Sequence, residues 1–176
     1  EEYYIQVDRV NFTGKTKEGQ LQLSEPQQTA FDGIKQSFID REVCLLHGVT
    51  SSGKTEIYIK LIEEYIKEEK QILYLLPEIA LTTQLVGRLR GYFGNRVAVF
   101  HSKYSNNERV EVWQQVLEQS PKAQIVIGAR SALFLPFSNL GLIIVDEEHE
   151  QTFKQVDPSP RYHARDAFIV LANSHK

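Results

Sequence analysis

Short apolar runs alternate with helical repeats along most of the chain. Runs of three to five consecutive apolar residues are typical of strands in a parallel sheet that is covered on both faces. Apolar residues that recur every three or four positions predict helices. On this basis we expect strands at residues 43–46, 72–76, 97–100, 125–127 and 142–145, and helices at residues 54–69, 82–93, 105–119 and 163–173.

The beginning of the chain has a different pattern. Residues 3–7 favour a strand, and a polar loop punctuated by glycine follows. Ser24 is expected to cap a helix, with Gln27 as its capping-box partner. We interpret residues 1–22 as a linker or lead-in from a preceding domain, and residues 23–176 as one domain.

The order of the expected elements predicts the fold class. Strands separated by helices imply βαβ crossovers and a mostly parallel sheet. The predicted fold is therefore α/β, a three-layer sandwich with helices on both sides of the sheet. In such folds a ligand binds at the carboxyl ends of the strands.

A phosphate-binding pattern, G-x-x-x-x-G-K-[ST], stands between the strand expected at 43–46 and the next helix. Backbone N–H groups of such a loop and the N-terminus of the following helix surround phosphates. We expect Lys54 to reach the β- and γ-phosphates of ATP and Thr55 to bind Mg²⁺. The alternative is a chance glycine turn. The predicted nucleotide-binding residues of the loop are Gly48, Val49, Thr50, Ser51, Ser52, Gly53, Lys54 and Thr55.

An acidic string, Asp-Glu-Glu-His, follows the strand expected at 142–145. A carboxylate at this end of a parallel strand points into the ligand crevice. Asp146 is expected to hold the Mg²⁺ through water, and Glu147 to orient and deprotonate the attacking water. A solvated acidic loop is the alternative interpretation.

Composition narrows the function classes. The net charge of −3 gives no bulk electrostatic case for nucleic acid, so any such site is a local patch. A single cysteine, Cys44, excludes an internal disulfide and a cysteine-built zinc site in this chain. No apolar run approaches membrane-spanning length, and we expect a cytoplasmic protein. The 176 residues include no methionine, from which we expect a fragment of a longer protein.

Several longer strings resemble the PriA family of bacterial replication-restart helicases, within helicase superfamily two. Besides the P-loop and Asp-Glu-x-His, the strings that carry this resemblance are residues 48–50, 76–82, 100–102, 128–134 and 161–166. The resemblance implies a RecA-like lobe of an ATP-driven 3′-to-5′ DNA helicase. It implies forked or single-stranded DNA, primosome proteins and single-stranded DNA-binding protein as partners of the parent protein, in the bacterial cytoplasm at the nucleoid.

The same resemblance implies that parts of the family's motor lie beyond Lys176: a second lobe with transition-state arginines, and zinc-binding cysteines. An arginine finger contributes roughly 10³–10⁵ in rate where it is used. We therefore expect this chain, truncated relative to the family, to be monomeric, to bind nucleotide with Mg²⁺ and to hydrolyse it slowly.

Further roles are carried over by resemblance. Gln27 resembles the glutamine that reads adenine, with the capping box as the competing interpretation. Thr82 and Arg130 resemble residues that contact single-stranded DNA. The competing interpretations are a helix cap for Thr82 and a solvated surface arginine for Arg130. Residues 152–163 resemble the family's aromatic-rich loop, which couples DNA binding to ATP hydrolysis. The competing interpretation is a surface loop without such a role. The coupling and DNA candidates in and near this loop are His149, Phe153, Lys154, Arg161 and Tyr162.

Two residues depart from the family pattern. Ser51 stands where glycine is usual, and it costs on the order of 1 kcal/mol if the position needs a positive φ. Pro160 stands where tryptophan is frequent, which removes a stacking surface.

Two other function classes are alternatives to a helicase lobe of this family. One is a P-loop kinase or a RecG-type fork-remodelling helicase. Asp-Glu-x-His argues against the kinase, and the string at 161–166 separates the chain from RecG. The other is a non-catalytic DNA- or partner-binding module with a vestigial P-loop, against which intact Lys54, Thr55, Asp146 and Glu147 argue.

Overall fold

The computed structural model describes residues 16–17, 19–48, 52–77, 83–157 and 159–175. The predictions made for residues 3–7, for Val49, Thr50 and Ser51 of the P-loop, and for Thr82 lie outside the described residues.

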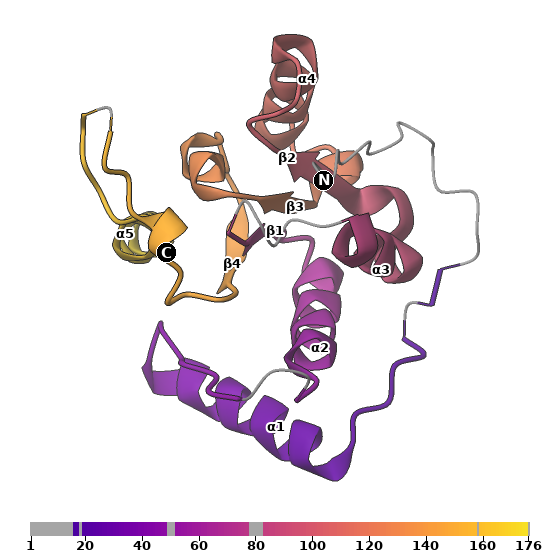
Figure 1. Ribbon diagram of the computed structural model, residues 1–176. Helices are drawn as coiled ribbons and strands as arrows, with labels where there is room; N and C mark the ends of the chain where they lie inside the picture. The colour runs from indigo at the N-terminus through magenta and orange to yellow at the C-terminus, as the bar shows by residue number, and fades with distance from the viewer. Residues whose placement is uncertain (1–15, 18, 49–51, 78–82, 158, 176) are drawn as a thin grey trace.

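A parallel sheet forms the middle layer (Figure 1). In the described part of the chain it has four strands in the order β2-β3-β1-β4, and every neighbouring pair is parallel. The sheet is thus the mostly parallel one that the alternating pattern predicts. The strands are β1 (Gln71–Leu75), β2 (Val97–Phe100), β3 (Ile125–Gly128) and β4 (Leu140–Val145).

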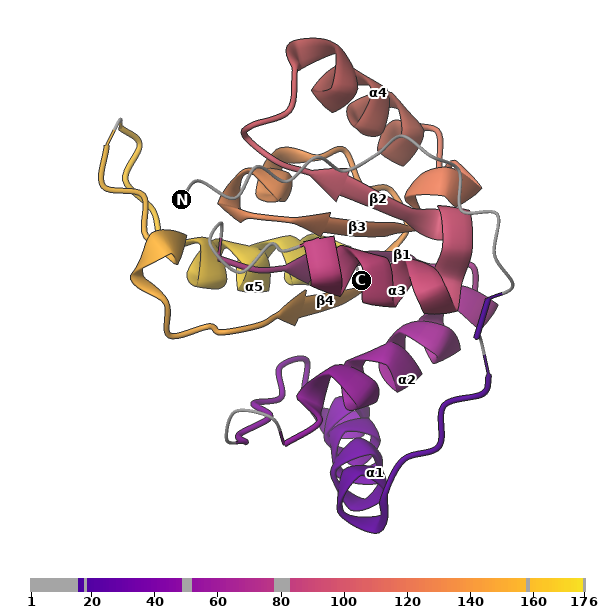
Figure 2. The same ribbon diagram turned by 45° about the vertical axis from the view of Figure 1, so that its right-hand side comes forward.

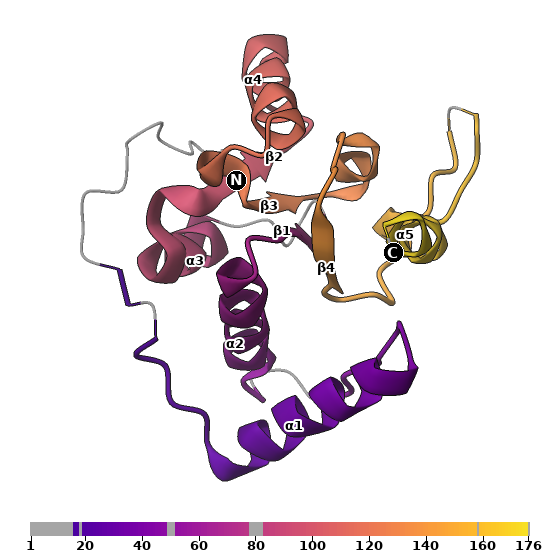
Figure 3. The same cartoon turned by 180° about the vertical axis from the view of Figure 1, so that it is seen from behind.

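Helices cover both faces of this sheet, so the predicted three-layer α/β architecture is confirmed. On one face α2 lies between α1 and the strands, with α3 beside it (Figures 1 and 3). On the other face α4 contacts β2 and α5 contacts β4 (Figure 2). The helices are α1 (Glu25–Asp40), α2 (Lys54–Lys67), α3 (Thr83–Phe93), α4 (Asn106–Leu117) and α5 (Ala164–Ser174).

Alternation along the strands divides the core into two clusters. Ile72 and Tyr74 of β1 face α2, whereas Leu73 and Leu75 face the α4–α5 side. Along β4, Ile144 points to the α2 side in the same way. Residue 146, two positions further on, is therefore expected on the α2 side as well. This alternation places Asp146, the first residue of the acidic string, on the side of the sheet where α2 begins.

One predicted strand does not form. Residues 43–46 pair with no strand in the described part of the chain, and Val43 and Leu45 are 55% and 73% exposed. The expectation of a strand buried on both faces is therefore wrong for this structure. An apolar run shows that a segment can be buried, but pairing also needs a free strand edge at hydrogen-bonding distance. Here a cavity separates the segment from β4.

The described part of the lead-in is attached to the α1–α3 layer. The Lys17 amide donates to the Gly91 carbonyl at 2.9 Å. The Gly19 amide donates to Oε1 of Glu63 at 2.8 Å, and Glu63 is itself buried in α2. Contacts with the domain thus begin before residue 22. No helix among the described residues is both long and apolar enough to cross a membrane.

Candidate functional site

The P-loop enters α2 through a left-handed glycine. Gly53 has φ 80° and stands at the N-cap of α2, so the first turn begins directly at Lys54. The Lys54 ammonium donates to the Gly48 carbonyl at 2.7 Å, which joins the two ends of the loop. Lys54 is thus held over the positive N-terminal end of α2, where an anion binds favourably.

Gln27 connects α1 to this loop. Its Oε1 accepts from the Ser24 amide at 2.9 Å and from the Ser24 hydroxyl at 3.0 Å. Its Nε2 donates to the Gly53 carbonyl at 3.2 Å. The capping box predicted from the sequence is therefore present. Both ends of the Gln27 amide have partners within the chain, so contact with adenine would require rotation of this side chain.

Asp146 lies where β4 ends, next to the start of α2. Its Oδ2 accepts from the Tyr74 hydroxyl at 2.8 Å, and its Oδ1 accepts from the Glu147 amide at 3.1 Å. Burial raises the pKa of Tyr74 well above its ordinary value, and the charge and hydrogen bond of Asp146 raise it further. The phenol consequently stays protonated at neutral pH and acts as the donor.

The rest of the acidic string points to other partners. Glu147 has a left-handed backbone with φ 51°, and its Oε2 lies 3.6 Å from Nε2 of His149. Glu148 accepts from Arg165 of α5 at 3.0 Å. The hydrogen bond from Arg165 to Glu148 raises the pKa of this exposed guanidinium, and Asp166 contributes in the same direction. Two separate strings of the sequence therefore meet at α5.

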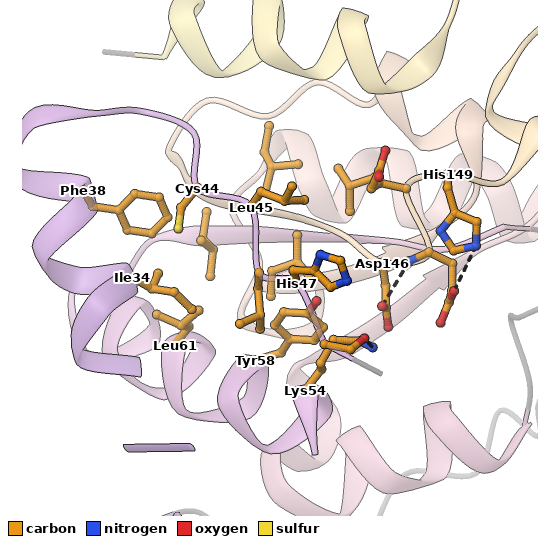
Figure 4. Close-up of a pocket in the computed structure, with 18 residues that line it drawn as sticks. Ile34, Phe38, Cys44, Leu45, His47, Lys54, Tyr58, Leu61, Asp146 and His149 are labelled. Atoms are coloured by element: carbon orange, nitrogen blue, oxygen red, sulfur yellow. Dashed lines mark hydrogen bonds and ion pairs between the residues drawn. The ribbon is translucent and has the colours of Figure 1, made fainter. Parts of the chain in front are cut away.

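A cavity of about 470 Å³ joins the P-loop to the acidic string (Figure 4). This volume is in the usual range for small-ligand sites. Figure 4 shows Lys54, Tyr58 and Asp146 at one end and an apolar region around Phe38 and Cys44 at the other. The polar end has a carboxylate on Asp146, an oxygen ligand of the kind that Mg²⁺ prefers. Thr55, the other predicted oxygen ligand, follows Lys54 in the sequence but is not among the residues that line the cavity. The residues present therefore fit a nucleotide with its metal.

A second, smaller cavity of about 180 Å³ lies at the carboxyl ends of β1 and β3. Pro77, Arg130 and Lys154 line it together, so three segments that the sequence left apart meet here. The Arg130 guanidinium donates to the Lys154 carbonyl at 3.0 Å, and Lys154 forms an isolated antiparallel bridge with His163. These contacts fix the beginning and the end of the aromatic-rich loop.

The aromatic residues of this region differ in exposure. Phe153 is 1% exposed and packs in the core on the α4–α5 side, so its ring offers no surface to a base in this arrangement. The half-buried Tyr162 ring meets the exposed Phe134 ring edge-on, with centroids 5.8 Å apart. Arg161 and Lys154 are exposed. The solvent-facing aromatic surface is therefore formed by Phe134 and Tyr162.

Comparison with known proteins gives the family. The sequence model of the family described as DEAD/DEAH box helicase matches residues 24–168, most of the chain. The chain belongs to the DEAD/DEAH box helicase family.

Within this helicase family the chain is similar to proteins named replication restart protein PriA. It is 44% identical to the one from Bacillus subtilis (strain 168) over 178 residues, 99% of this chain and 22% of the relative. It is 50% identical to the one from Haemophilus influenzae over 157 residues, 88% of this chain and 21% of the relative. The resemblance to the PriA family is thereby confirmed. The chain spans about a fifth of the length of these relatives.

Some residues of this candidate site are not singled out by the sequence alone. Tyr74 and Tyr58 stand in apolar patterns, which predict only that they belong to a strand and a helix. Their rings meet edge-on, 5.8 Å apart, beside Asp146. The available signal was the phenol itself, because a buried tyrosine hydroxyl usually has a hydrogen-bond partner. Arg165 belongs to the string at 161–166, whose pattern does not predict the contact with Glu148.

Proposed function

We propose that this chain is the ATP-binding motor lobe of an ATP-dependent 3′-to-5′ DNA helicase that acts in replication restart. The observation that carries the proposal is that Lys54 and Asp146 line one cavity at the carboxyl ends of a parallel sheet. A phosphate-binding cation and a metal-binding carboxylate at one site are the parts that ATP hydrolysis requires. Family membership and the PriA relatives support the helicase reading.

In the proposed site Lys54 binds the β- and γ-phosphates. Its ammonium now donates to the Gly48 carbonyl, so binding replaces a neutral acceptor by a charged phosphate oxygen. Thr55 and Asp146 would hold Mg²⁺, which supplies neutralisation of charge on the phosphates. Gln27 would turn from Gly53 to the adenine edge, where a carboxamide can both donate and accept.

Glu147 is proposed to orient and deprotonate the attacking water. Its carboxylate lies on the cavity wall, 3.6 Å from His149, and the His149 side chain is exposed. A charge change at His149 would therefore be felt by Glu147 directly. This pair is our candidate for transmitting DNA binding to the hydrolytic centre.

Single-stranded DNA is proposed to cross the second cavity. The half-buried Arg130 and the exposed Lys154 and Arg161 suit phosphate contact, and Tyr162 suits base stacking. Thr82 is proposed as a further phosphate contact, and Phe153 as an internal support of the loop. The proposal places the whole protein in the bacterial cytoplasm, with primosome proteins and single-stranded DNA-binding protein as partners.

The test is titration of the chain with a fluorescent ATP analogue and Mg²⁺. Lys54→Ala removes a charged hydrogen bond to phosphate and is expected to weaken binding by about 10- to 100-fold. Lys67→Ala is the matched control, because it removes the same charge from the exposed far end of α2. That position is roughly 20 Å away along the helix. Equal binding by Lys54→Ala and wild type would overturn the proposal.

Hydrolysis by the chain alone tests the role of a second lobe. We expect slow turnover that DNA does not stimulate, because the arginines of the transition state are proposed to come from outside this lobe. Fast turnover stimulated by DNA would show that one lobe suffices.

A further inference from the structure

Tyr74 brings a hydroxyl group into a strand that is otherwise apolar over residues 72–76. The residue is 0% exposed, and alternation directs its ring to the α2 side of β1. The Tyr58 ring of α2 packs against it edge-on at 77°. A phenol in such a place needs a partner, because an unpaired buried hydroxyl is costly.

The partner of this hydroxyl is Asp146, 72 residues further along the chain, at 2.8 Å. The contact depends on register, since Leu75 of β1 lies opposite Val145 of β4. Tyr74 precedes Leu75 by one residue, and Asp146 follows Val145 by one residue. The tyrosine ring is long enough to reach diagonally from one strand to the end of the other.

The two oxygens of the Asp146 carboxylate are held separately. Oδ2 accepts from Tyr74, and Oδ1 accepts from the Glu147 amide at 3.1 Å. Rotation of the carboxylate would break at least one of these bonds. Each oxygen has a second lone pair, so both remain able to meet a cation or its water.

We propose that Tyr74 is a positioning residue, which fixes the Asp146 carboxylate in the orientation that receives the Mg²⁺ of a bound nucleotide. The inference rests on the proposed function and adds to it a residue from the middle of the sheet. Tyr58 completes the arrangement by holding the Tyr74 ring in place from α2.

A packing role for Tyr74 predicts a different outcome from a positioning role. Phenylalanine fills nearly the same space, so Tyr74→Phe keeps the ring contact with Tyr58 and removes only the hydroxyl. Loss of a hydrogen bond to a metal ligand typically lowers metal affinity by about 10- to 100-fold. The phosphates bound by Lys54 are unaffected, so binding in the absence of metal is expected to stay unchanged.

The experiment measures the affinity of a fluorescent ADP analogue in EDTA and at increasing Mg²⁺. For Tyr74→Phe we expect wild-type affinity in EDTA and an increase of about 10-fold in the Mg²⁺ concentration that gives half of the metal effect. Tyr65→Phe is the matched control, because it removes a half-buried phenol hydroxyl from α2, away from Asp146. It is expected to behave as wild type.

Two results would overturn the inference. One is an unchanged Mg²⁺ dependence in Tyr74→Phe, and the other is an equal loss of affinity with and without metal, which indicates packing. The same substitution in an Asp146→Asn background should have no effect on the metal dependence. If Tyr74→Phe is too unstable at the assay temperature, both titrations are repeated at a lower temperature, because this variant keeps the ring contact with Tyr58 and is the one that isolates the hydroxyl. A wild-type chain that binds no nucleotide would instead refute the proposed function.

Discussion

The Gly53→Ala substitution tests how closely the P-loop is built against α1. Gly53 has φ 80°, a left-handed conformation that L-residues rarely adopt. A Cβ atom at this position would lie 2.1 Å from Nε2 of Gln27. The substitution therefore strains the backbone and also displaces a side chain that belongs to the capping box of α1.

The size of the effect follows from these two contributions. A non-glycine residue in the left-handed region costs about 1–2 kcal/mol. The Gln27 amide is the end of a flexible side chain and can move, but it then loses its bond to the Gly53 carbonyl, about 0.5–1.5 kcal/mol. Together they lower the free energy of unfolding by about 1.5–3.5 kcal/mol.

The assay is urea denaturation of the nucleotide-free chain for wild type, Gly53→Ala, Gln27→Ala and the double variant. In the Gln27→Ala background the contact with the Gln27 amide is absent, and only the end of the Glu56 side chain, 3.2 Å from the added Cβ, has to move. Gly53→Ala should then cost mainly the backbone contribution of about 1–2 kcal/mol. The two substitutions should therefore be less than additive. A loss below about 0.5 kcal/mol for Gly53→Ala would refute the left-handed conformation. Strict additivity would refute the contact with Gln27.

Two further predictions concern buried polar groups. Burial is the main cause that raises the pKa values of Tyr58, Tyr74 and Tyr104, and it raises that of Tyr104 from 10.0 to about 12. Above pH 10 these phenols therefore remain neutral in the folded chain, whereas they ionise in the unfolded chain. Their contribution to stability is complete below pH 10, and the part that comes from Tyr104 is lost as the pH rises towards 12. Urea denaturation at pH 8 to 11 measures this loss of stability. A Tyr104→Phe variant should lose less stability over this range, and an equal loss would contradict burial as the cause. The buried Gln71 amide makes three hydrogen bonds to backbone groups. Gln71→Leu should therefore lower the free energy of unfolding, measured in urea, by about 2–4 kcal/mol. Gln28→Leu, on the exposed face of α1, is the control and should leave the stability nearly unchanged. A Gln71→Leu chain as stable as wild type would show that water replaces those bonds.

Patterns within a single segment were sufficient for most of the fold. The strands at 72–76, 97–100, 125–127 and 142–145 form within about two residues of their expected bounds, as do the helices between them. Their periodicity reflects burial on one or both faces, which is a property of the segment itself. The P-loop and the acidic string were found from spacing, because phosphate and metal chemistry requires those residue types in that order.

Contacts between distant segments were decided only by the tertiary structure. The bond between Tyr74 and Asp146 depends on the register of β1 against β4, and that between Gln27 and Gly53 depends on how α1 packs on α2. The apolar run at 43–46 pairs with no strand among the described residues, although its composition is that of a buried strand. The sequence pattern of a segment predicts which of its faces is buried. Which strand ends meet, and which side chains fix the candidate metal ligand, follow from register and packing across the whole domain.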